Sequence, residues 1–88
     1  MRYSRRSGVS ETPVSDELFL VDAASGELFH LDRSARGLWT LLAEPSEFAT
    51  ILATFREAFP DTPADRLERD LRQALATLMG RGLVVTVP

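Results

Sequence analysis

The hydrophobic positions in the first third of the chain follow the short spacing of β-strands. Val9–Val14 contains Thr12-Pro13, and a proline there is typical of an edge strand or a strand end. Leu18–Val21 and Glu27–Leu31 are two apolar runs, and Asp22–Gly26 between them has the residues of a tight turn. This pattern predicts a β-hairpin, to which Val9–Val14 adds a third strand.

The hydrophobic spacing then changes to that of helices. Asp32 is a good N-cap for a first helix, which is expected to end at Glu44-Pro45 because the residue before a proline disfavours helical backbone. Ser46 is expected to cap a second helix, and Pro60–Pro63 breaks it. A third helix is predicted from about Ala64 to Gly80.

The order of these elements indicates an α+β fold. An N-terminal three-stranded antiparallel sheet precedes three helices, and strands segregated before helices are typical of that class. The Gly80-Arg81-Gly82 sequence is expected to close the third helix, and Leu83–Val87 is a short β-prone tail. The outline is that of a winged helix-turn-helix.

The composition limits the chain to a single small domain over residues 1–88. Hydrophobic residues make up 44% of the 88 residues and charged residues 26%, which is typical of a globular protein. No cysteine is present, which excludes disulfides, thiolate metal sites and a cysteine nucleophile. The apolar runs are much shorter than a membrane span, so we expect a cytoplasmic protein without membrane contact.

The charge pattern argues against nucleic-acid binding. All ten basic residues are arginines, and three of them (Arg2, Arg5 and Arg6) lie in the first ten residues, where there is no acid. The remaining 78 residues therefore carry a charge of −6, and the pI of the chain is about 5.0. A DNA-binding domain normally presents a basic face. Residues 1–8 are expected to form a flexible basic arm.

No catalytic or metal-binding set is apparent. His30 is the only histidine, and no second histidine or cysteine could join it at a metal ion. The only glycine pair of note, Gly80-Arg81-Gly82, follows a helix and does not match a phosphate-binding loop. We therefore expect no cofactor, no metal and no enzymatic activity, and a binding role becomes the default.

Strand addition is the natural binding mode for a small sheet with an open edge. The predicted strand Glu27–Leu31 leads directly into the helices, so it is a candidate for lining a groove. Phe29 and Leu31 share one face of this strand, while Leu28 and His30 share the other. We expect Phe29 and Leu31 to face the helices.

Several segments then show a resemblance to a known family. Asp22–Asp32 forms a hairpin that ends in Leu-Asp, and Ser34–Leu42 follows with an alanine, a Leu-Trp pair and a double leucine. Arg69–Leu78 and Arg81–Val84 look like the family's closing helix and its Gly-Leu-Val end. In this order and spacing, over roughly Val14 to Val85, the chain resembles the PqqD-like family.

The resemblance implies a peptide-recognition domain with a winged-helix fold. The leader peptide of a ribosomally synthesised precursor would add as an antiparallel strand to the third strand, beside the third helix. The domain would present it to a modifying enzyme such as a radical SAM enzyme, a cyclase or a leader protease. By matching position, the implied peptide-binding residues are Leu28, Phe29, His30, Leu31, Leu67, Asp70, Leu71 and Ala74. Core positions are assigned to Leu31, Trp39, Leu42 and Leu78. A proline at Phe29 is expected to remove an N–H that pairs with the guest.

Other interpretations stay open at this point. Leu67, Leu71 and Ala74 also fit simple core packing. A DNA-binding winged-helix regulator is the main alternative function, although the third helix is nearly neutral, with Arg66, Arg69 and Arg72 set against Asp65, Glu68 and Asp70. A third alternative is a structural subunit that binds an enzyme through an apolar patch away from the third strand. The precursor, the pathway and the choice between monomer and dimer are undetermined.

Overall fold

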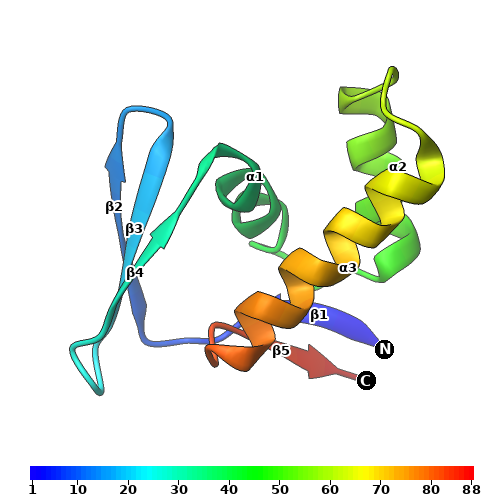
Figure 1. Cartoon of the computed structure of the whole chain (residues 1–88). Coiled ribbons are helices and arrows are strands. Elements are labelled where there is room, and N and C mark those ends of the chain that lie inside the picture. Colours follow the sequence, from blue (N-terminus) through cyan, green and yellow to red (C-terminus); the bar gives the residue numbers. More distant parts are fainter.

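The computed structural model describes residues 1–88 and has the predicted α+β architecture (Figure 1). Three antiparallel strands form a sheet on one side, three helices pack against it, and a short pair of strands joins the two ends of the chain. The elements in chain order are β1 (Arg2–Arg5), β2 (Val9–Val14), β3 (Glu17–Asp22), β4 (Leu28–Leu31), α1 (Arg33–Leu41), α2 (Phe48–Ala58), α3 (Ala64–Gly80) and β5 (Val84–Val87).

The three-stranded sheet has the order β2-β3-β4, so β4 lies at an edge. Both pairs are antiparallel, and in the second pair Leu18 lies opposite Leu31 and Val21 opposite Leu28. Gly26 has a φ of 75° in the turn that leads to β4, a backbone conformation that glycine adopts without a steric cost. The predicted hairpin is thus confirmed.

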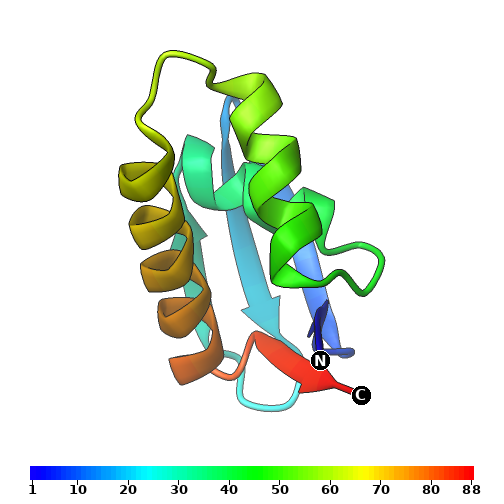
Figure 2. The same cartoon turned by 90° about the vertical axis from the view of Figure 1, so that its right-hand side faces the viewer.

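The core lies between the inner face of this sheet and the helices. Figure 2 shows α2 and α3 in front of the sheet. Leu18 and Leu20 on β3 are buried against the helices, as are Phe29 and Leu31 on β4, so the predicted orientation of β4 is correct. The four predicted core residues are all buried, namely Leu31, Trp39, Leu42 and Leu78.

The helix boundaries agree with the sequence except at the end of α1 and the start of α2. The helix α1 ends at Leu41 and not at Glu44-Pro45 as expected, because a turn closed by the Ala43 N–H and the Thr40 carbonyl follows it. The Asp32 side chain accepts a hydrogen bond from the Ala35 N–H at 2.9 Å and caps α1 as predicted. Ser46 does not cap α2: Glu47 occupies the N-cap position, and the Ser46 hydroxyl donates to the Glu44 carbonyl. The Ser46 backbone instead pairs with Tyr3, an interaction between distant segments that local sequence does not encode.

The N-terminal segment, which we expected to be a flexible arm, forms β1 and pairs with β5. Its arginines hold distant parts of the chain together. The Arg5 guanidinium lies 4.8 Å from the centre of the Trp39 ring and donates to the Trp39 carbonyl at 2.8 Å. Arg6 donates to the Gly82 carbonyl and forms an ion pair with Asp22 at 2.6 Å. Arg5 and Arg6 therefore make contacts within the folded chain and do not belong to a free basic arm.

The Asp22 contacts predict how stability depends on pH. The Ala24 N–H and the Arg6 guanidinium hold the pKa of the Asp22 carboxyl below its ordinary value of 3.8, although desolvation opposes them. Because the pKa is lower in the folded state, the ionised Asp22 carboxylate stabilises the fold at every pH above its ordinary pKa. This contribution is lost as the pH falls through the lowered pKa of the folded state. We expect Asp22→Asn to lower the melting temperature at pH 7 and to have little effect below the lowered pKa. A melting-temperature difference that does not shrink as the pH falls from 7 to 2 would contradict this assignment.

None of the helices is long and apolar enough to cross a membrane.

Candidate functional site

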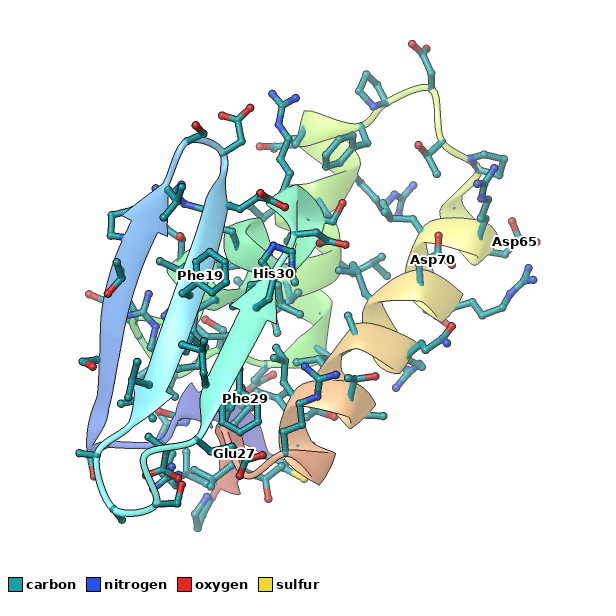
Figure 3. The ribbon with its side chains drawn as sticks, turned by 60° about the vertical axis from the view of Figure 1, so that its left-hand side comes forward. Phe19, Glu27, Phe29, His30, Asp65 and Asp70 are labelled. Atoms are coloured by element: carbon teal, nitrogen blue, oxygen red, sulfur yellow. The ribbon has the colours of Figure 1, made fainter.

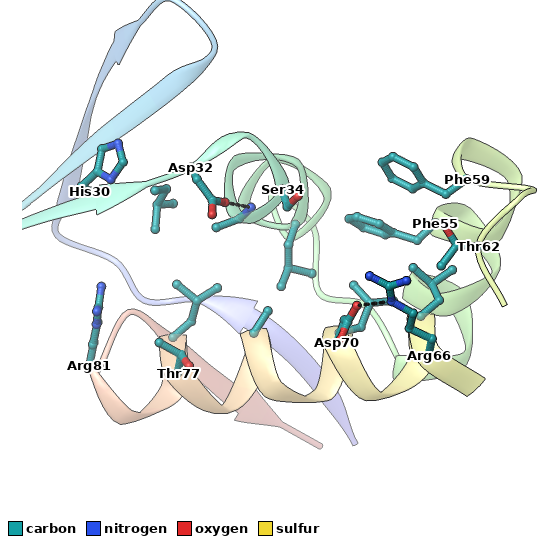
Figure 4. Close-up of a pocket in the computed structure, with 17 residues that line it drawn as sticks. His30, Asp32, Ser34, Phe55, Phe59, Thr62, Arg66, Asp70, Thr77 and Arg81 are labelled. Carbon is teal, nitrogen blue, oxygen red and sulfur yellow. Dashed lines mark hydrogen bonds and ion pairs between the residues drawn. The ribbon is translucent and has the colours of Figure 1, made fainter. Parts of the chain in front are cut away.

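A groove of about 570 Å³ opens between β4 and α3, with α1 at its base (Figure 4). One wall is the end of β4 and the start of α1, the other is the inward face of α3, and the end of α2 closes the groove. The lining residues are His30, Leu31, Asp32, Ser34, Ala35, Leu38, Phe55, Phe59, Thr62, Arg66, Leu67, Asp70, Leu71, Ala74, Thr77, Leu78 and Arg81.

The groove brings together six of the eight residues singled out from the sequence, namely His30, Leu31, Leu67, Asp70, Leu71 and Ala74. The other two belong to β4 but not to the lining. Leu28 points away from the helices and is 60% exposed, whereas Phe29 is buried in the core. Leu67 and Leu71 are also members of the core cluster, so core packing and groove lining are properties of the same side chains.

The free edge of β4 faces this groove. In an antiparallel pair, hydrogen-bonded and non-hydrogen-bonded residue pairs alternate. The Asp22 N–H donates to the Glu27 carbonyl at 3.0 Å, which sets the phase of the β3–β4 ladder. Phe29 and Leu31 therefore direct their backbone N–H and C=O groups toward β3.

By the same alternation, Leu28 and His30 direct their backbone groups toward the open edge. An unpaired strand edge is a template for another strand. The two residues thus offer two N–H donors and two C=O acceptors beside the groove. Their side chains, however, lie on the outer face of the sheet, away from the helices.

Arginines lie at both ends of the groove. Arg66 and Asp70, one turn apart on α3, form a loose ion pair at 3.9 Å, and both side chains are well exposed. At the opposite end, the Arg81 guanidinium lies 5.9 Å from the centre of the Phe29 ring. Between these ends the α3 wall consists of Leu71, Ala74, Thr77 and Leu78 and is mainly apolar, whereas Asp32 and Ser34 contribute polar groups to the facing wall.

An aromatic pair closes the groove at its α2 end. The rings of Phe55 and Phe59 stack with their centres 6.0 Å apart, and Phe59 is 47% exposed. Neither residue was placed in the site from the sequence. Their spacing of four residues, which puts both rings on one face of a helix, was the available signal.

His30 forms a small cluster with residues of the neighbouring strand. Its Nε2 lies 2.7 Å from the Glu17 Oε1, and its ring centre is 5.1 Å from that of Phe19. All three side chains lie on the outer face, and the carboxylate and imidazole are about half exposed. No group of three or more histidine, cysteine, aspartate or glutamate residues in the chain could hold a metal ion.

The sequence matches the model of a known protein family over most of its length. The model of the family described as coenzyme PQQ synthesis protein D (PqqD) matches residues 17–84. The chain belongs to the PqqD family. The matched region includes β3, β4 and all three helices, and therefore the whole groove.

Two solved structures are similar to this PqqD-family chain over almost its full length. One is described as TbiB1 in complex with the TbiA(beta) leader peptide, with a TM-score of 0.83 and 25% identity, covering 97% of this chain and 98% of that one. The other is described as lasso peptide synthetase B1 complexed with the leader peptide, with a TM-score of 0.80 and 20% identity, covering 98% and 100%. No curated protein matches the chain.

Proposed function

We propose that this PqqD-family protein binds the leader peptide of a ribosomally synthesised precursor by strand addition to β4. It then presents the precursor to a modifying enzyme, such as a radical SAM enzyme, a cyclase or a leader protease, and performs no chemistry itself. The observation that carries this proposal is the open edge of β4 beside an apolar groove.

The hydrogen-bonding pattern of β4 determines which residues of an antiparallel guest would face the groove. Guest residues opposite Leu28 and His30 would form the backbone hydrogen bonds, and their side chains would lie on the outer face. Guest residues opposite Phe29 and Leu31 would point into the groove. The α3 side chains that would meet them are Leu67, Asp70, Leu71 and Ala74. Alternating guest positions should therefore be apolar.

The first similar structure supports the nature of the guest. Its description names a leader peptide, it shares 25% identity with this chain, and the similarity extends over nearly all of both chains. A leader peptide is extended and flexible before it binds, which suits recognition through main-chain hydrogen bonds. Ordering such a segment costs part of the interaction free energy, so we expect affinity of about micromolar order.

The charges on α3 do not favour the alternative of a DNA-binding regulator. Two of its arginines are engaged within the chain: Arg66 pairs with Asp70, and Arg72 pairs with Glu68 while it stacks on the Phe48 ring at 4.0 Å. A helix that enters the major groove normally presents unpaired basic side chains to phosphate.

The proposal is tested by titration with the leader segment of the short peptide encoded beside this protein. With the segment fluorescently labelled, polarisation should rise to saturation at about micromolar concentration and change little with salt. A scrambled leader of the same composition is the control and should bind at least about tenfold more weakly. Failure to bind the leader, with salt-sensitive binding to duplex DNA instead, would replace peptide recognition with DNA binding.

A further inference from the structure

The outer face of the three-stranded sheet is not covered by any other element of the chain. In Figure 1 all three helices lie on one side of the sheet, and Figure 3 turns the opposite side toward the reader, with Phe19 and His30 in front. Residues directly opposite in antiparallel strands project on the same face. The pairing of Thr12 with Phe19 and of Phe19 with His30 therefore defines one row across this outer face.

Apolar side chains occupy half of the strand positions on this face. They come from all three strands: Val14 from β2, Phe19 and Val21 from β3, and Leu28 from β4. Val14 is 47% exposed and Leu28 is 60% exposed, which makes them two of the six large hydrophobic residues of the chain that are classed as exposed. An apolar cluster on a sheet face that faces solvent is typical of an interaction surface.

The charge around this surface is mainly acidic, although the Arg36 guanidinium reaches the Ser15 and Glu17 carbonyls at one end of it. Residues 7–32, which form the whole sheet, contain six acids and no arginine or lysine. Asp22 is paired with Arg6, Glu11 is paired with Arg5, and Asp32 caps α1. Glu17 lies on the outer face beside His30, while Asp16 and Glu27 lie in the two turns at its ends. A second copy of this chain would bring like charges together, whereas a basic protein surface would be attracted.

The surface is also continuous with the edge to which the guest would add. Leu28 and His30 belong to both, so the outward side chains of a paired guest would extend the same face. The strands β2 and β3 are about 20 Å long and β4 is about 13 Å long, so at a spacing of about 4.8 Å they present roughly 250 Å² in projection. A guest strand as long as β4 would add about a quarter. A standard protein interface buries about 800 Å² on each partner, so the guest strand would add substantially to a small docking face.

We propose that the modifying enzyme docks on this outer sheet face, through a surface with an apolar centre and basic flanks, and that the bound guest strand completes the face. The inference rests on the proposed function, because it assumes that a guest adds to β4. In this arrangement the groove side of β4 binds the guest, and the outer side of the sheet presents the bound guest to the enzyme.

The test is the affinity of the purified modifying enzyme encoded with this protein, measured with and without saturating leader peptide. Val14 is the position to change, because it is exposed, lies on β2 and is distant from the guest edge. Val14→Arg should weaken enzyme binding at least about tenfold, and Val14→Glu should weaken it less because a basic partner accepts the acid. Saturation with the leader should strengthen enzyme binding to the unchanged protein at least about fivefold.

Val85→Arg is the matched control, since Val85 is an exposed strand valine on β5, outside the sheet in question. It should leave enzyme binding unchanged. All three variants should keep the melting temperature and the leader affinity of the unchanged protein, so that loss of leader binding would count against the proposed function instead.

The proposal is overturned if Val14→Arg binds the enzyme as tightly as the unchanged protein, or if Val85→Arg loses as much affinity. Weaker binding by Val14→Glu than by Val14→Arg, or an enzyme affinity that does not respond to the leader, would overturn it as well. Sedimentation velocity adds a further outcome: a dimer that Val14→Arg converts to a monomer would assign this face to a second copy of the chain.

Discussion

Replacing His30 with proline is expected to weaken leader-peptide binding by roughly 10- to 100-fold while the domain stays folded. The His30 N–H points to the open edge of β4, so proline removes a donor for the guest but no hydrogen bond within the sheet. A bound guest would be left with an unsatisfied carbonyl, which costs about 1–3 kcal/mol. Peptide titration by fluorescence polarisation, together with circular dichroism, measures both effects.

Two control variants separate the backbone from the side chain. His30→Thr retains the N–H and a β-compatible side chain, so it should bind the leader nearly as well as the unchanged protein. Phe29→Pro should instead destabilise the domain, because the Phe29 N–H faces β3. From the sequence, the N–H that pairs with the guest was expected at Phe29, whereas the ladder places it at His30. Equal leader affinity for His30→Pro and the unchanged protein would show that the guest does not pair with β4.

Replacing Trp39 with alanine is expected to cost about 3–5 kcal/mol of folding stability. Trp39 is 1% exposed at the centre of the core, and its ring also supports the Arg5 guanidinium. A domain of this length is stable by only about 4–13 kcal/mol, so the loss is a large fraction of its total stability. For a domain this small, such a loss corresponds to a fall in melting temperature of at least about 12 °C, which calorimetry would detect.

Trp39→Phe is the matched control for this change. The Trp39 Nε1 is buried without a hydrogen-bond partner, so phenylalanine removes no hydrogen bond and retains much of the apolar volume. It should therefore cost clearly less than alanine. A Trp39→Ala variant that melts at the temperature of the unchanged protein would show that the core is organised differently.

Features that depend on neighbouring residues in the chain could be predicted from the sequence. The alternation in Leu28–Leu31 indicated which side of β4 faces the core, because side chains of a strand alternate between two faces. The cap at Asp32 and the bounds of α3 at Ala64 and Gly80 were also predicted correctly. Each depends on backbone geometry and side chains within a few residues, and therefore leaves a readable pattern.

The candidate site could be predicted in part, through resemblance to a family more than through spacing. Leu67 and Leu71 were expected either in the core or in the groove, and they belong to both. Phe55 and Phe59 were missed at the groove because only the packing of α2 against α3 brings the end of one helix to the start of the other. Periodicity identifies the face of a helix but not the element that it meets.

The contacts between the two ends of the chain had no local signal at all. Arg2–Arg5 carries charges and no strong apolar alternation, so the segment was interpreted as an arm, yet it pairs with Val84–Val87 at the other end of the chain. The Arg6 side chain likewise forms hydrogen bonds with Asp22 and Gly82, which are not its neighbours in the chain. The chain pattern thus specifies strands, helices and the face that each buries, since these follow from periods of two and 3.6 residues. Pairing between distant strands, the open edge of β4 and the groove beside it arise only when the packed elements bring remote backbone groups within hydrogen-bonding distance.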